Sequence, residues 1–118
     1  MRRKKGSEVM FGNKLGKVER AIEKKKVDKL AELMMDKDEA VRLAAIDGLG
    51  KLKAGDAVNP LITLLRDASA QVRVHAAQAL GQIGDPHSKA HIIHAAQAEK
   101  DEQVKQEMVR AEALLREY

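Results

Sequence analysis

Apolar side chains along residues 41–50 recur at the spacing of one helix face. The positions i, i+3, i+4 and i+8 hold Val41, Ala44, Ala45 and Leu49. Such a series lies on one side of a 3.6-residue helix. Residues 61–65 carry a wider apolar stripe, which is typical of a helix covered by neighbours. Because no window alternates apolar and polar residues with a period of two, the pattern predicts an all-α fold.

Both patterns repeat along the chain. The first-type helices are expected around residues 41–50 and 72–81 and from Val104 onward, and the second-type helices around 27–36, 58–67 and 89–96. The first two copies of each type lie 31 residues apart, and the last first-type copy follows after 32 residues. Two interleaved patterns that share one interval predict a tandem repeat with one helical hairpin per copy.

Each first-type helix is preceded by a residue suited to cap its first turn. These residues, three positions before the repeated valine, are Asp38, Ser69 and Asp101. A side-chain oxygen at such a position accepts the free amide hydrogens of the turn that follows. Asp85 followed by Pro86 predicts the same kind of start for the last second-type helix.

A single helical hairpin cannot bury both sides of its apolar surface, so neighbouring hairpins are expected to stack. We predict a short right-handed α-solenoid of about three hairpins within a domain spanning residues 13–118. The first-type helices are expected on the convex side and the second-type helices on the concave side. Residues 1–12 are expected to form a flexible basic segment outside this domain.

The segment 69–86 carries a recognisable motif. It reads Ser-x-x-Val-Arg-x-x-Ala-Ala-x-x-Leu-Gly-x-Ile-Gly-Asp-Pro, and it resembles the short HEAT-like repeat of the phycobilisome-lyase type. The resemblance covers roughly residues 27–118 and implies an armadillo-like α-solenoid. It implies no single activity, because this repeat occurs in bilin lyases, a metal-dependent hydroxylase, DNA-repair glycosylases and plain scaffolds. The last copy has Glu112-Ala113 where the motif has Leu-Gly.

The same resemblance implies a structural role for a repeated cation. Arg42, Arg73 and Lys105 occupy equivalent positions, and in this repeat the Arg pairs with acidic residues and carbonyls of adjacent turns. We expect Asp67 and Asp85 as its partners, in a ladder that ties each hairpin to the next.

Composition removes several kinds of chemistry. The chain has no Cys, which excludes thiol catalysis, disulfides and thiolate metal sites. Its two aromatic residues are Phe11 and Tyr118, too few for stacking on bases. The sequence has no phosphate-binding Gly-rich loop, no nucleophile elbow and no His-Glu-x-x-His motif. We therefore expect a non-enzymatic protein that uses no cofactor.

Histidines give the one candidate for metal binding. His87, His91 and His94 are spaced i, i+4 and i+7, which places three imidazoles along one side of a helix. No Asp or Glu lies among them to complete a catalytic site, so they are weak candidates. His75 lies where the resemblance to the hydroxylase would place a ligand pair, but Ala76 follows it instead of Glu, so no ligand role is expected.

Charge is concentrated at the start of the chain. Residues 1–30 hold 11 Lys and Arg against 4 Asp and Glu, a net of +7, and the rest holds 11 against 14, a net of −3. The clusters are residues 2–5 and Lys24-Lys25-Lys26. They indicate either binding to nucleic acid or another polyanion, or a solvated segment that aids solubility. No membrane span or signal peptide is evident, so a cytoplasmic protein is expected.

The exposed register of the second-type helices is the predicted partner-binding surface. Its residues are Lys29, Glu32, Asn59, Thr63, Arg66, His91 and His94. A row of parallel helices can hold a peptide by several contacts, so we favour a protein-interaction module or adaptor. The alternatives are a polyanion binder and a lyase- or hydroxylase-related subunit with a His metal site. Apolar residues of the last helix also suggest self-association through the solenoid ends.

Overall fold

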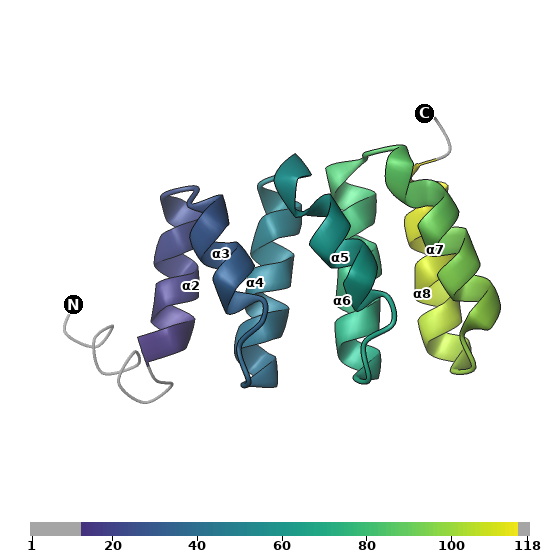
Figure 1. The fold of residues 1–118 in the computed structure, drawn as a ribbon, viewed down its shortest axis with the longest axis horizontal. Helices are drawn as coiled ribbons and strands as arrows, with labels where there is room; N and C mark the ends of the chain where they lie inside the picture. The colour runs from purple at the N-terminus through teal and green to yellow at the C-terminus, as the bar shows by residue number, and fades with distance from the viewer. Residues whose placement is uncertain (1–12, 116–118) are drawn as a thin grey trace.

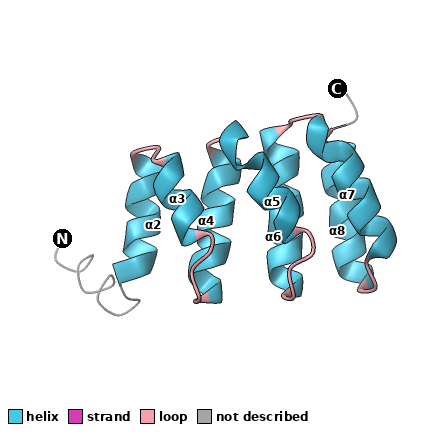
Figure 2. Cartoon of the chain, in the orientation of Figure 1, coloured by secondary structure: helices cyan, strands magenta, loops and turns pink. Residues whose placement is uncertain are grey.

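The computed structural model describes residues 13–115, and within that range it contains helices and no strand (Figures 1 and 2). The elements are α2 (Asn13–Glu23), α3 (Val27–Leu33), α4 (Glu39–Lys51), the 3-10 helix η1 (Gly55–Ala57), α5 (Val58–Leu64), α6 (Ala70–Ile83), α7 (His87–Ala98) and α8 (Glu102–Ala113). Three hairpins, α3–α4, α5–α6 and α7–α8, stack in chain order after α2. The predicted all-α solenoid is confirmed. The basic segment expected over residues 1–12 lies outside the described residues.

Helix starts follow the predicted caps. The side chains of Asp38, Ser69 and Asp101 accept amide hydrogens from the first turns of α4, α6 and α8, respectively. The Asp85 carboxylate accepts the His87 amide at 2.9 Å, just before α7. These local bonds satisfy donors that a helix leaves free at its start.

The helices form two rows with different spacing. The first-type helices α4, α6 and α8 pack directly on one another, and α2 continues this row. The second-type helices α3, α5 and α7 pack mainly on their own hairpin partners and spread apart from one another (Figure 1). The more tightly spaced row is the shorter side of a curved stack, which is its concave side. The expectation that first-type helices lie on the convex side is therefore wrong.

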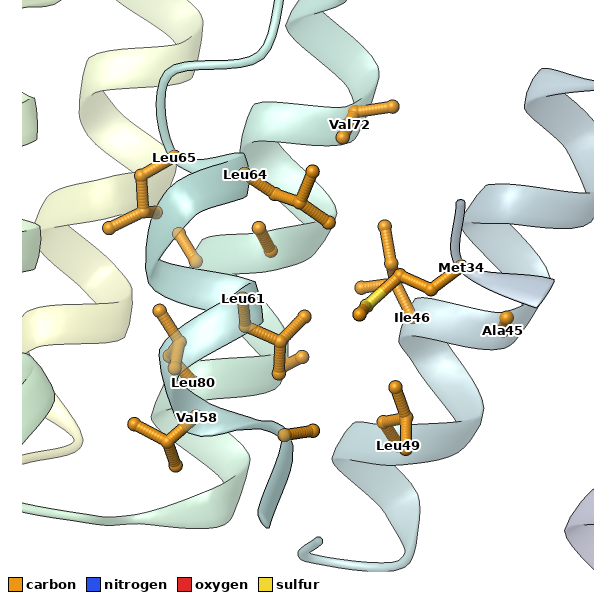
Figure 3. Packing of buried hydrophobic residues seen from close by; sticks show 14 of the residues in the cluster. Met34, Ala45, Ile46, Leu49, Val58, Leu61, Leu64, Leu65, Val72 and Leu80 are labelled. Carbon is orange, nitrogen blue, oxygen red and sulfur yellow. The ribbon is translucent and has the colours of Figure 1, made fainter. Parts of the chain in front are cut away.

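The core is a continuous aliphatic layer between the two rows. Met34 and Ile46 from the α3–α4 hairpin point into the same space as Leu64 from α5 (Figure 3). Leu61 and Leu80 are fully buried in the next layer along the stack. Each hairpin thus buries apolar surface against the following one, which is the main stabilising contribution in a solenoid.

Glycines allow the close approach of the first-type helices. A Cβ added at Gly50 on α4 would lie 3.0 Å from the backbone Cα of Ala79 on α6. A Cβ at the equivalent Gly81 on α6 would lie 3.0 Å from Leu114 and 3.2 Å from the carbonyl oxygen of Ala111. Two glycines 31 residues apart therefore set the tight spacing of this row.

Candidate interaction surfaces

Arg73 ties the second hairpin to the third. Its Nε and Nη2 donate to the two carboxylate oxygens of Glu99 at 2.9 and 3.0 Å. Its Nη1 donates to the carbonyl oxygens of Asp67 at 2.9 Å and Ala68 at 3.2 Å. Glu99 lies in the loop before α8, so this bidentate pair joins consecutive hairpins, as a charge-assisted pair of this geometry can.

The equivalent cation of the first hairpin pairs with no carboxylate among the described residues. Arg42 donates from Nη1 to the carbonyl oxygen of Asp36 at 3.4 Å, and its buried Nε has no hydrogen-bond partner within residues 13–115. Asp67 stands where the next repeat has Glu99, but its carboxylate accepts the Ser69 amide at 2.9 Å. Asp is one methylene shorter than Glu, and this difference explains why Asp67 does not also reach Arg42.

Two other expected members of the ladder have different roles. The Asp85 carboxylate caps α7 and contacts neither Arg42 nor Arg73. The ammonium group of Lys105 bonds no side chain within residues 13–115. The predicted partners Asp67 and Asp85 are therefore corrected to the Asp67 carbonyl and the Glu99 carboxylate. The sequence does contain a signal for Glu99, because this acidic residue occupies the position equivalent to Asp67 in the next repeat.

A matching pair joins α2 to the first hairpin. Lys14 Nζ lies 3.1 Å from a carboxylate oxygen of Asp36, which sits in the loop before α4. The backbone amide of Asp38 donates to the same carboxylate at 2.9 Å. The hydrogen bond from the Asp38 amide, and after it the hydrogen bond from Lys14, hold the pKa of the Asp36 carboxyl below its ordinary value of 3.8.

The predicted partner-binding residues are all exposed but do not share one groove. The members on α3, Lys29 and Glu32, pair with each other at 3.5 Å and border the end of α2. Arg66 and His94 line a separate hollow between α5 and α7. The remaining members, Asn59, Thr63 and His91, are exposed and line neither hollow. Because the second-type helices α3, α5 and α7 spread apart from one another, the residues of the predicted partner-binding surface lie in separate regions.

The histidines are placed in three different surroundings. The rings of His87 and His91 meet edge to face with centroids 5.2 Å apart, whereas His94 faces the hollow that Arg66 and Arg73 line. His75 Nδ1 lies 2.7 Å from the Asp47 carboxylate on α4. In the part of the chain that the structure describes, no group of three or more His, Asp or Glu side chains is arranged to hold a metal ion.

The solvent-facing side of the first-type row forms a continuous surface, which we name the inner face. It comprises Glu39, Leu43 and Asp47 on α4, Gln71, Val74, His75 and Gln78 on α6, and Gln103, Gln106, Glu107 and Arg110 on α8. A hollow lies between α6 and α8 on this face. Sequence reasoning missed it because it placed these helices on the convex side.

Hydrogen bonds cross the inner face from helix to helix. Ser69 at the start of α6 donates to Glu39 on α4 at 2.9 Å, and the His75–Asp47 contact joins the same two helices. Gln78 on α6 donates to Glu107 on α8 at 3.3 Å. These bonds hold neighbouring helices in register at the surface as the aliphatic core does below it.

A third hollow lies at the α2–α3 end of the stack and is strongly basic. We name it the basic hollow, and its charged residues are Lys17, Arg20, Lys24, Lys25, Lys26, Asp28, Lys29 and Glu32. The predicted Lys24–Lys26 cluster is thus brought together with cations of α2 and α3. The other predicted cluster, residues 2–5, lies outside the described residues. Among residues 13–115, no helix is long and apolar enough to cross a membrane.

Comparison with known proteins identifies the repeat. A family model of HEAT repeats matches residues 27–113. No curated protein matches the sequence. A solved structure, the crystal structure of epoxyqueuosine reductase with a tRNA-Tyr epoxyqueuosine-modified tRNA stem loop, is similar, with 34% sequence identity and a TM-score of 0.63. The similarity covers 64% of this chain and 20% of that one, so the match spans about a fifth of the reductase's length.

Proposed function

Because this chain belongs to the HEAT-repeat family, we propose that it is a non-enzymatic interaction module that binds a protein partner on its inner face. The observation that carries the proposal is the set of hydrogen bonds that cross this face between α4, α6 and α8. A surface held in register before binding loses little conformational freedom when a partner docks, which favours affinity.

The chemistry of the inner face suggests the kind of partner. Asp101 and Glu107 line its hollow beside several glutamines, and of the described residues there Arg110 is the single Lys or Arg. Glu39 and Asp47 add negative charge on α4. We infer that the partner presents a basic and polar segment, as a helix or an extended peptide laid along the row.

A non-catalytic role is consistent with how the ionisable groups of this face are used. Glu39 accepts a hydrogen bond from Ser69, the N-cap of α6, and Asp47 contacts His75 on α6. Glu107 accepts a hydrogen bond from Gln78 on α6 and also pairs with Arg110 at 2.8 Å. These carboxylates join helices to one another and do not converge on a common point. The proposed mechanism is therefore complementarity of shape and charge.

Photo-crosslinking from defined positions tests this proposal. A photoreactive residue placed at Gln78, in the hollow of the inner face, should capture a discrete protein in native cells. The matched control places the same residue at Thr63, an exposed position on α5 of the other row. Glu107→Arg should suppress capture from position 78. Equal capture from both positions, or capture that Glu107→Arg leaves unchanged, would contradict the proposal.

RNA is the second candidate partner. The similar reductase structure contains a tRNA stem loop, and this observation favours RNA over other polyanions. The inner face itself is poorly suited to phosphates because of its acidic residues. Treatment of the captured material with ribonuclease separates the two candidates, since a direct protein contact survives it.

A further inference from the structure

The basic hollow shares no residue with the inner face, and a partner bound on the inner face would leave its positive charge without a role. We propose that it binds the phosphate backbone of a base-paired nucleic acid. Six cations line it against two carboxylates, those of Asp28 and Glu32. This inference does not depend on the protein partner, and it assigns the nucleic-acid alternative to a surface of its own.

Most of these cations are uncompensated. Lys29 lies 3.5 Å from Glu32. The other five, Lys17, Arg20, Lys24, Lys25 and Lys26, have no carboxylate within ion-pair distance among the described residues. All six side chains are exposed. Like charges held this close repel one another, so an anionic ligand that neutralises several of them is favoured.

The turn that carries the three consecutive lysines is hydrogen-bonded to the end of α2. The amide of Lys25 donates to the carbonyl of Ile22 at 3.0 Å, and that of Lys26 donates to the carbonyl of Ala21 at 2.8 Å. Lys25 itself adopts the left-handed conformation with a φ of 55°, where glycine is the usual residue. Lys53 adopts the same conformation one hairpin later, so the turn positions the charges and is not itself a sign of a ligand.

The cations at the end of α2 lie along one side of its helical turns. Lys17 and Arg20 belong to α2, and Lys24 follows its last residue, with its amide donating to the Arg20 carbonyl at 3.0 Å. Their spacing of i, i+3 and i+7 corresponds to roughly 10 Å along a helix axis at 1.5 Å per residue. Phosphates of one strand advance by about 3.4 Å per base-pair step. Measured along the duplex axis, the row therefore spans about three base-pair steps, and Lys25, Lys26 and Lys29 line the same hollow.

Two other anionic surfaces fit less well. Single-stranded nucleic acid is held largely by stacking on aromatic side chains, and no Phe, Tyr or Trp occurs among residues 13–115. A membrane surface is bound by cations together with inserted apolar side chains. The exposed large apolar residues Met35, Ile93, Val109 and Leu114 do not line the basic hollow.

Fluorescence anisotropy with the full chain tests the proposal. The probes are a labelled RNA hairpin, a DNA hairpin with the same stem, and vesicles that contain phosphatidylserine. The test variant is Lys24→Glu, Lys25→Glu and Lys26→Glu combined. The control variant combines Lys37→Glu, Lys51→Glu and Lys100→Glu, which are exposed positions outside the basic hollow with the same change in net charge.

We expect both hairpins to bind the unmodified protein, with affinity that falls steeply with salt. Loss of three phosphate contacts should make the dependence of log K on log salt shallower, reducing the magnitude of its slope by about 3. It should also reduce the affinity on the order of 100-fold at 0.1 M salt. The control variant should retain most of its affinity. A second test variant, Lys17→Glu with Arg20→Glu, should also bind weakly while its circular dichroism stays helical.

Several outcomes would overturn the inference. Equal losses in the test and control variants would show that net charge alone is responsible. Unchanged affinity in the test variant would place binding in residues 1–12, and tighter binding to vesicles than to hairpins would indicate a membrane surface. Failure here is separable from failure of the proposed function, because the Lys24–Lys26 variant should still be crosslinked from position 78.

Discussion

The Arg73–Glu99 pair allows a quantitative test of how the hairpins are held together. In the variant Glu99→Ala, Arg73 loses two charge-assisted hydrogen bonds, at 2.9 and 3.0 Å, from a carboxylate whose side chain is 6% exposed. Deleting one partner of a buried ion pair costs about 3–5 kcal/mol. Because the Arg73 side chain is 20% exposed and keeps two carbonyl acceptors, we expect a loss of about 2–3 kcal/mol.

A loss of this size is readily measured. A domain of this length is stable by about 5–15 kcal/mol, and the expected loss corresponds to a fall in Tm of roughly 10 °C or more. Thermal and urea unfolding followed by circular dichroism give the two quantities independently. The matched control is Glu19→Ala, an exposed carboxylate on α2, which should change stability by less than about 0.5 kcal/mol.

The shorter acid gives a sharper version of the same test. Glu99→Asp retains the charge but shortens the side chain by one methylene, which recreates the arrangement seen around Arg42. It should lose most of the stability that Glu99→Ala loses. If Glu99→Asp were as stable as the unmodified protein, side-chain length would not decide whether this pair forms. If Glu99→Ala lowered Tm no more than the Glu19→Ala control, the pair would not stabilise the stack.

Three further predictions concern the same framework. Asp67→Glu should reach Arg42 and raise the free energy of unfolding by about 1 kcal/mol, measured by urea titration; no gain would show that length is not the limiting factor. Gly81→Ala should destabilise by about 1–3 kcal/mol through overpacking, whereas Gly55→Ala, whose added Cβ meets nothing within 4 Å, should be close to neutral by the same measurement. The lowered pKa of Asp36 stabilises the fold above the ordinary value near 3.8, and this contribution is lost as pH falls through the lower folded-state pKa. Asp36→Asn should therefore flatten the dependence of stability on pH below about 4, and an unchanged acid-unfolding profile would contradict this assignment.

The helices could be predicted from the sequence because their signals are local. The caps at Asp38, Ser69 and Asp101 lie within three residues of the amides that they bind, and the 31-residue interval identifies the hairpins. These signals depend on neighbouring residues and on helix periodicity, and both are visible in one sequence.

The arrangement of the two rows could not be predicted in the same way. Which row is more tightly spaced depends on the contacts of Gly50 and Gly81 with the next first-type helix, and residue types alone do not reveal the curvature. The inner face and its hollow were missed for this reason. The ladder was predicted in outline, but its acidic partner was wrong because the reach of Glu99 differs from that of Asp67 by one methylene.

The basic hollow could be predicted in part. The Lys24–Lys26 cluster is evident in the sequence, but the contribution of Lys17 and Arg20 depends on how α2 packs beside α3. The local run of charge thus indicated the surface, and the packing of the first helices determined its extent.

Hydrogen–deuterium exchange of the complex with the partner captured from position 78 shows which row of helices the partner covers. Slower exchange in α6 and α8, with no change in α3 and α5, is the predicted result. Protection confined to α3, α5 and α7 would contradict the account, because it would place the partner on the splayed row.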